Sequence, residues 1–317
     1  MPENSPQASR GVYRFAVFTS CCTVLLLMAG GLVTNNLAGD SVPDWPLAYG
    51  RLIPPLVGGI RFEYSHRVIA GVVSILTLVL AIWIARVERR PVARRLGWLA
   101  LGLVIAQAVL GGIRVLEGDP AVSATAHAAL AQIFFITLAG LSLYLSPWWQ
   151  SDLPTASDSG SPRAASIAAW TTVVIFLQVV LGAAFRHGAI GIIPHLIGAG
   201  IVTALVVWTG RAVKRRFPGA RDLRRGVVWL HSFFGLQVLL GFAAWWAMTS
   251  ALAAVQPTAL FVTLTVAHVL GGALLLASST LLTLACFRVV RGASRAEGSL
   301  AEPAQRAAAG SAERAGG

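Results

Sequence analysis

The chain has 317 residues, of which 56% are hydrophobic and only 12% charged, and its mean hydropathy is +0.71. A soluble domain carries roughly 25% charged residues, so this composition excludes an ordinary soluble globule. The high apolar content equally excludes a disordered chain. What remains is a multi-pass membrane protein.

Eight apolar segments are each long enough to cross a bilayer core of roughly 30 Å as a helix. The first is longer than the roughly 7 to 15 apolar residues of a signal-peptide core, so we take it as a helix of the fold. We therefore expect an all-α polytopic membrane protein. In chain order the predicted transmembrane helices are Tyr13–Val33, Tyr64–Ala85, Leu96–Val115, Val122–Leu145, Ile167–Phe185, Ile192–Thr209, Val227–Met248 and Leu260–Phe287.

The distribution of positive charge predicts the orientation. Eight spans put both termini on one side, and if that side is the cytoplasm, the inner segments hold most of the 25 Lys and Arg residues. The net charge of +12 therefore marks topology and predicts no nucleic-acid partner. We expect cytoplasmic N- and C-termini in a cell membrane, with the lipid bilayer as the surroundings. The basic residues outside or at the outer boundary are Arg51, Arg61, Arg67, Arg114 and Arg186.

Composition also divides the chain. Residues 148–165, rich in Ser, Pro and Asp, predict a cytoplasmic linker between an N-terminal four-helix half (1–147) and a C-terminal four-helix half (166–291). Residues 292–317, rich in Ala, Gly, Arg and Glu, predict a disordered tail. The one long outer loop, Asn35–Phe62, contains too many turn-forming residues to be helical throughout.

A short pattern recurs along the chain. The third, fifth and seventh spans contain Gln-x-x-Leu-Gly, and the first has a weaker counterpart that ends at Gly30 without the glutamine. Each even-numbered span carries a histidine in its outer half. The pattern predicts two pseudo-repeated four-helix bundles with two histidines each. The histidines are His66, His127, His195 and His268, and the glutamines are Gln107, Gln178 and Gln237.

Two histidines facing each other in a bundle suggest a haem site. A polar side chain at membrane depth is costly and usually functional, and haem iron accepts a histidine on each axial face. Small residues one turn inward of each histidine leave room for the flat macrocycle. Arg67, Arg114 and Arg186 are candidate partners of haem propionates, and His187 could line a haem edge. The alternative is that these histidines only hydrogen-bond between closely packed helices.

Glu63 stands three residues before His66, so both side chains share one helix face. A carboxylate beside the edge of a haem on His66 could move protons or stabilise a developing positive charge. Alternatively, Glu63 favours the helix dipole or pairs with Arg67. Only the N-terminal half has this acid, because Ile192-Ile193-Pro194 precedes His195.

Three stretches of this sequence resemble the heme A synthase family, and the resemblance extends over about residues 13–290. They are Pro43-Asp44-Trp45-Pro46-Leu47, Glu63-x-x-His66-Arg67 and Leu181-Gly182-Ala183-Ala184-Phe185-Arg186-His187. The resemblance implies a membrane oxidoreductase that converts a ring methyl group of heme O to the formyl group of heme A, through a hydroxymethyl intermediate, for cytochrome oxidase assembly.

The resemblance also implies roles for individual residues. His66 and His127 would bind the substrate heme O, Glu63 would be the catalytic residue, and His195 and His268 would hold a resident heme B for electron transfer. The haem sites would face the outer side of the membrane, with functional coupling to heme O synthase. Some members carry a cysteine pair in the first outer loop, which is absent here, so no thiol route for electrons is expected.

Two other classes of function fit part of the pattern. A membrane electron carrier with two bis-histidine b-type haems, exchanging electrons with quinone, would have no need of an acid beside only one haem. A transporter that relays protons through the histidines would bind no haem. Glu63 and the long outer loop favour the enzyme.

Overall fold

The computed structural model describes residues 6–118, 120–152, 156–158, 160–250 and 257–315, with side chains between residues 10 and 289. Its described residues form helices, turns and loops, with one isolated β-bridge between Ala48 and Arg51. The helices are α1 (Pro6–Asn35), α2 (Ile60–Val87), α3 (Pro91–Leu116), α4 (Ala121–Leu145), α5 (Pro147–Gln150), α6 (Ala164–Arg186), α7 (Ile193–Arg216), α8 (Arg221–Thr249) and α9 (Ala259–Ala315).

Eight of these helices are long and apolar enough to cross a membrane, which confirms the predicted all-α polytopic class. Proline fixes several helix starts, because its ring favours the first helical turn and its missing N–H has no partner there. It occupies this position in α3, α5 and α7. Large apolar side chains such as Leu239 and Phe242 are exposed on the outside of the protein, where lipid surrounds a membrane protein.

The structure extends the predicted helices and adds one. Most spans gain several residues at their ends, since charged side chains such as those of Lys214 and Arg215 continue a helix beyond its apolar part. The predicted linker 148–165 includes most of α5 and the start of α6. The backbone of α9 continues through the tail from Gly292, with residues 316–317 outside the described part, and disorder of this tail stays a prediction.

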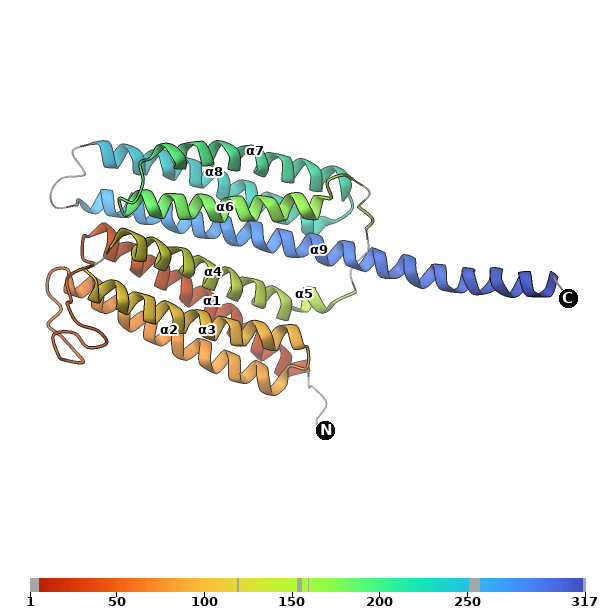
Figure 1. The fold of residues 1–317 in the computed structure, drawn as a ribbon, viewed down its shortest axis with the longest axis horizontal. Coiled ribbons are helices and arrows are strands. Elements are labelled where there is room, and N and C mark those ends of the chain that lie inside the picture. Colours follow the sequence, from red (N-terminus) through yellow and green to blue (C-terminus); the bar gives the residue numbers. More distant parts are fainter. Residues whose placement is uncertain (1–5, 119, 153–155, 159, 251–256, 316–317) are drawn as a thin grey trace.

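The helices lie in two groups of four, side by side (Figure 1). In the first group, α1 contacts α2 and α4, and α3 contacts the same two helices. The second group repeats this arrangement with α6, α7, α8 and α9. Each group has its own buried core, around Leu138 and Ile84 in one and Leu276 and Leu230 in the other. That the groups are copies of one repeat, with a boundary in the linker, stays a prediction.

The two groups meet along α1 and α4 on one side and α6 and α9 on the other. The linker is tied to the ends of the second group. Arg216 pairs with Asp158 at 3.2 Å, and Arg288 donates to the carbonyl oxygens of Trp149 and Ser151. The start of α1 and the end of α9 lie at this end of the bundle, and the loop between α1 and α2 lies at the opposite end (Figure 1). Cytoplasmic termini would therefore put this loop outside, and that orientation stays a prediction.

Candidate functional site

Each of the four repeated histidines packs against a glycine of the helix before it. A Cβ placed on Gly182 would lie 2.9 Å from Cε1 of His195, closer than real Cβ atoms approach their neighbours. The absence of a side chain at these glycines therefore leaves the space that each imidazole ring fills. The other pairs, with the corresponding distances, are Gly30 and His66 at 3.2 Å, Gly111 and His127 at 3.1 Å, and Gly241 and His268 at 3.2 Å.

His195 and His268 come together inside the second group. Their ring centroids are 6.4 Å apart and their planes are inclined by 82°. Two imidazoles that bind one iron from opposite sides have centroids about 6 Å apart, from two metal–nitrogen bonds of about 2 Å and the radius of each ring. The Nδ1 atom of His268 is also buried and, among the described residues, has no hydrogen-bond partner. The pair therefore fits the axial ligands of one haem.

His66 and His127 occupy the matching places in the first group. Their helices, α2 and α4, both pack against α1 and α3, so the two histidines come from opposite corners of this group. Nδ1 of His66 is buried and has no partner within the described part of the chain. The described residues hold no cluster of three or more His, Cys, Asp or Glu side chains that could bind a bare metal ion. Two histidines suffice for haem, because the macrocycle supplies the other ligands.

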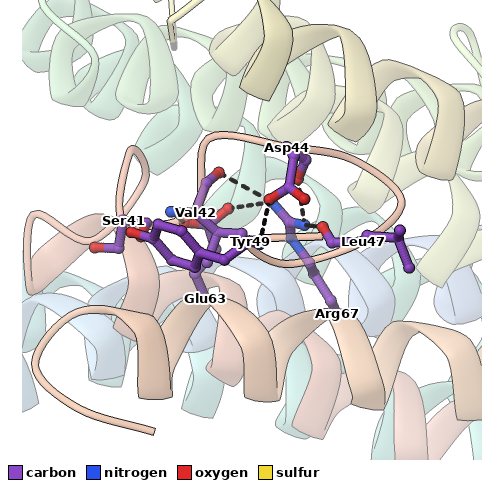
Figure 2. A network of polar contacts seen from close by, with 7 residues as sticks. All are labelled: Ser41, Val42, Asp44, Leu47, Tyr49, Glu63 and Arg67. Atoms are coloured by element: carbon purple, nitrogen blue, oxygen red, sulfur yellow. Dashed lines mark hydrogen bonds and ion pairs between the residues drawn. The ribbon is translucent and has the colours of Figure 1, made fainter. Parts of the chain in front are cut away.

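Glu63 connects α2 to the loop between α1 and α2 (Figure 2). Its side chain is almost fully buried, and both carboxylate oxygens have partners. Oε1 pairs with Nη2 of Arg67 at 2.6 Å, and Oε2 accepts the backbone N–H of Val42 at 2.9 Å. The predicted alternative of a Glu63–Arg67 pair is therefore confirmed, and the structure adds a bond to the loop that the sequence did not indicate.

Arg67 completes this connection. Its Nη1 donates to the carbonyl oxygens of Asp44 and Leu47 at 2.8 and 2.9 Å, and its Nη2 also donates to that of Val42 at 3.3 Å (Figure 2). We call Glu63, Arg67 and the loop segment Val42–Leu47 the loop clasp. The sequence suggested Arg67 as a propionate partner; in this structure its two terminal nitrogens bind the loop, and the propionate role stays a prediction.

Asp44 stabilises the turn that follows. Its two carboxylate oxygens accept the backbone N–H groups of Tyr49 at 2.6 Å and Gly50 at 2.7 Å. The hydrogen bond from Gly50, together with that from Tyr49, holds the pKa of this carboxyl below its usual range. Tyr49 and Gly50 both have positive φ values, 54° and 67°, and such backbone is strained for a residue with a side chain. The Asp44 carboxylate offsets that strain at Tyr49.

Trp45, next to Asp44, rests on the outer end of α3. A Cβ placed on Gly112 would be 2.7 Å from Cδ2 of the Trp45 ring, so this glycine provides the surface on which the indole lies. The loop is thus fixed to α2 by the clasp and to α3 by Trp45. Arg114, in the last turn of α3, adds positive charge near Glu63 and His66.

The remaining predicted residues, Arg186 and His187, lie at the end of α6. Arg186 donates from Nε to Oδ1 of Asn35 at 3.1 Å and from Nη2 to the carbonyl oxygen of Thr34, so it joins the two helix groups. His187 is the residue that ends α6, beside Arg186. His231 lies in the inner half of α8, packs on Gly210 and has Nδ1 2.8 Å from the carbonyl oxygen of Val227.

The glutamines of the Gln-x-x-Leu-Gly pattern have no role assigned by the sequence, but the structure shows what they contact. Gln178 donates from Nε2 to the carbonyl oxygen of His195 at 2.8 Å, and Nε2 of Gln237 is 3.4 Å from Nε2 of His268. Their recurrence at one spacing was the available signal. The backbone acceptors of the loop clasp gave no such signal, because any residue type has a carbonyl group.

Fold and site together define an all-helical, multi-pass membrane protein. It has two repeated histidines in each group of four helices, one of these histidine pairs in close contact, and an acid three residues before His66. A family model described as "Cytochrome oxidase assembly protein" matches residues 60–195, a segment that includes Glu63, His66, His127 and His195. The chain is similar to proteins named heme A synthase, which confirms the resemblance found in its motifs.

Three of these relatives show the extent of the similarity. The heme A synthase of Symbiobacterium thermophilum is 28% identical over 255 residues, which is 69% of this chain and 81% of that protein. That of Lysinibacillus sphaericus is 31% identical over 188 residues, 57% of this chain and 60% of the relative. That of Shouchella clausii is 32% identical over 133 residues, 41% and 44% of the two chains. The chain thus spans less than two thirds of the second and third relatives.

Proposed function

We propose that this protein is a heme A synthase, a membrane oxidoreductase that oxidises a ring methyl group of heme O to a formyl group. The observation that carries the proposal is a difference in functional residues between the two helix groups. Each carries two repeated histidines, and only the first adds a buried carboxylate, Glu63, three residues before a histidine. Similarity to heme A synthases supports the same conclusion.

In this proposal the second group holds the cofactor. His195 and His268 bind a heme B, whose iron supplies one-electron redox chemistry when bound. The 6.4 Å spacing of their rings supports this assignment. Arg186 and His187 stand at the outer end of α6, where they are candidates to line the haem. The chain places these residues next to α1 through the Arg186–Asn35 bond, so the cofactor group adjoins the substrate group.

The first group binds the substrate. His66 and His127 hold heme O, and Arg67 and Arg114 supply positive charge for its propionates. An open groove of about 300 Å³ lies between α1 and α2. It is lined by Met28, Ala29, Leu32, Arg61, Phe62, Ser65 and Ile69.

Glu63 has two tasks in this mechanism. In the structure its carboxylate holds the loop closed through Val42 and Arg67. With the substrate bound, the same carboxylate would accept a proton from the reacting edge or stabilise the positive charge that develops there as the methyl group is oxidised. A loop movement that releases Oε2 from Val42 would free this oxygen for the reaction.

The experiment is an analysis of haems extracted from membranes of cells that express this protein together with a heme O synthase. The proposal expects heme A or hydroxylated heme O, and expects neither from a His66→Ala control. Two heme B groups per chain with heme O unchanged would contradict the proposal and support the electron carrier instead. Joint purification with the heme O synthase would test their coupling.

A further inference from the structure

In the second helix group, the histidine and glutamine of neighbouring helices interlock. The His195 ring on α7 packs against Gly182, four residues after Gln178 on α6. In return, the Gln178 amide packs against Gly198, three residues after His195; a Cβ on Gly198 would overlap Oε1 of Gln178. The two side chains cross, and each rests on the glycine of the opposite helix.

The crossed pair is also joined by polar contacts. Nε2 of Gln178 donates to the carbonyl oxygen of His195 at 2.8 Å and lies 3.1 Å from Nδ1 of its ring. The glutamine thus touches both the backbone and the imidazole of the same residue. Contacts at two points, together with packing on Gly198, leave the Gln178 side chain few alternative rotamers.

The same arrangement occurs between α8 and α9. The His268 ring packs against Gly241, four residues after Gln237, and the Gln237 amide packs against Gly271, three residues after His268. Nε2 of Gln237 lies 3.4 Å from Nε2 of His268 and 3.2 Å from where a Cβ on Gly272 would stand. Both histidines of the 6.4 Å pair therefore have the same glycine packing, while the polar contact at His268 is the longer one and involves the other ring nitrogen.

The first helix group lacks this arrangement. The position equivalent to Gln178 on α1 is Leu26, and the third residue after His66 is Ile69. On α3 the glutamine is present as Gln107, but the third residue after His127 is Leu130. Neither histidine of the first group has both a glutamine partner and the reciprocal glycine.

Each interlocked glutamine keeps an unused acceptor that faces the glycine of the opposite helix, and Gln107 of the first group keeps an unused acceptor too. Within the described part of the chain, Oε1 of Gln178 and Oε1 of Gln237 are buried without a hydrogen-bond partner. A histidine that binds a metal through one ring nitrogen usually donates the N–H of the other to an acceptor, which fixes the ring orientation. An amide rotation that turned Oε1 of Gln178 toward the ring would let it accept that N–H in exchange for the present hydrogen bond to the His195 carbonyl oxygen.

We propose that Gln178 and Gln237, seated on Gly198 and Gly271, are positioning residues that lock both ligand histidines of the second group, so that this group retains its haem. The first group, without the lock, exchanges its haem. The inference rests on the proposed function, because it explains how one protein keeps a cofactor haem and releases a product haem from similar histidine pairs.

The test uses Gln178→Met and Gln237→Met, because methionine is unbranched and of similar size but has no amide. Both are made in a His66→Ala background. This substitution removes one histidine from the first group, so that the second group keeps the complete histidine pair and the measured haem is the one bound there. The purified protein is mixed with an excess of a haem-scavenging apoprotein, and the rate of haem transfer is measured with the absorption spectrum and reduction potential of the haem. Loss of such a partner typically lowers metal affinity about 10- to 100-fold, so we expect at least about tenfold faster haem loss and a shifted potential.

Gln107→Met is the matched control, since it removes the same amide from a helix without the reciprocal glycine. We expect it to leave haem loss from the second group at the parent rate. Gly198→Ala approaches the lock from the other side, because the added methyl group displaces the Gln178 amide, and it should also speed haem loss. It serves as the second variant if a glutamine variant folds poorly.

Unchanged haem loss, spectrum and potential in both Gln178→Met and Gly198→Ala would overturn the lock. Equal acceleration by Gln107→Met would overturn it too, because Gln107 lies in the first group and does not contact the ligand histidines of the second group. Failure of the proposed function is a separate result: a protein with residue 66 intact that forms no heme A from heme O contradicts that function, whatever the glutamine variants do.

Discussion

Replacing Glu63 by alanine gives the sharpest test of the loop clasp. The substitution removes the acceptor of the Val42 N–H and the ion-pair partner of Arg67 at once. The Arg67 guanidinium keeps the uncharged backbone carbonyls of Asp44 and Leu47 as partners, and the nearby Asp44 carboxylate, already bound to two backbone N–H groups, balances its charge only in part. We expect the loop to detach from α2 while the helices remain folded.

The magnitude follows from burial. The side chains of Arg67 and Glu63 are 17% and 5% exposed, and removing one partner of a buried ion pair costs about 3–5 kcal/mol. Because Arg67 is partly exposed and keeps other acceptors, we take about 3 kcal/mol, the lower end of that range. At 1.36 kcal/mol per factor of ten, the equilibrium between docked and detached loop shifts by roughly 100-fold.

Amide hydrogen exchange on the detergent-solubilised protein measures this shift. The Val42 amide and its loop neighbours should lose about 100-fold in protection in Glu63→Ala. Glu88→Ala is the matched control, because Glu88 pairs with Arg90 at 2.6 Å near the opposite end of α2. Unchanged loop protection in Glu63→Ala would refute the clasp. The variant should also keep its heme B and lose heme A formation, and full heme A formation would refute the catalytic role.

Three further predictions follow from the same structure. His195→Ala removes one ligand of the 6.4 Å pair, so the purified protein should lose its resident haem, measured as haem absorption per chain. Unchanged haem absorption per chain would contradict the ligand role of His195. Gly112→Ala puts a methyl group 2.7 Å from the Trp45 ring, and such overpacking should weaken loop docking by about 1–3 kcal/mol; loop proteolysis at the parent rate would contradict this. The pKa of Asp44 is lower in the folded protein than in the unfolded chain. The ionised carboxylate therefore stabilises the folded loop fully above the ordinary pKa of the group, and this stabilisation is lost as the pH falls through the lower folded-state pKa. Proteolysis should therefore be independent of this group near neutral pH and rise only in acid, and Asp44→Asn should abolish that rise.

Much of the fold could be predicted from the sequence. Eight spans follow from the length of the apolar runs, because a segment without charges that matches the bilayer thickness has only the helix available to satisfy its backbone. The helix ends were less predictable. Residues such as Lys214 and Arg215 continue α7 past its apolar part, since a helix at the membrane surface tolerates charge. The short helix α5 inside the predicted linker gave no apolar signal.

The candidate site was likewise predictable only in part from the sequence. Histidines recurring at one depth were visible because polar residues are rare in apolar spans, and the structure brings His195 and His268 together as a pair. The partners of Arg67 were not visible, because three of its acceptors are backbone carbonyls of a loop 20 to 25 residues earlier in the chain. Such acceptors carry no residue-type signature.

The sequence by itself thus determined the membrane class, the number of spans, the four histidines and the resemblance to heme A synthases, since all of these depend on the order and polarity of residues along one helix. Only the tertiary structure decided that each histidine rests on a glycine of the preceding helix, that Gln178 and Gln237 cross over the histidines of one group, and that Glu63 fastens the outer loop. Those contacts depend on the rotation and spacing of neighbouring helices. Helix rotation and spacing are set by the packing of whole faces, which a one-dimensional pattern of single residues leaves open.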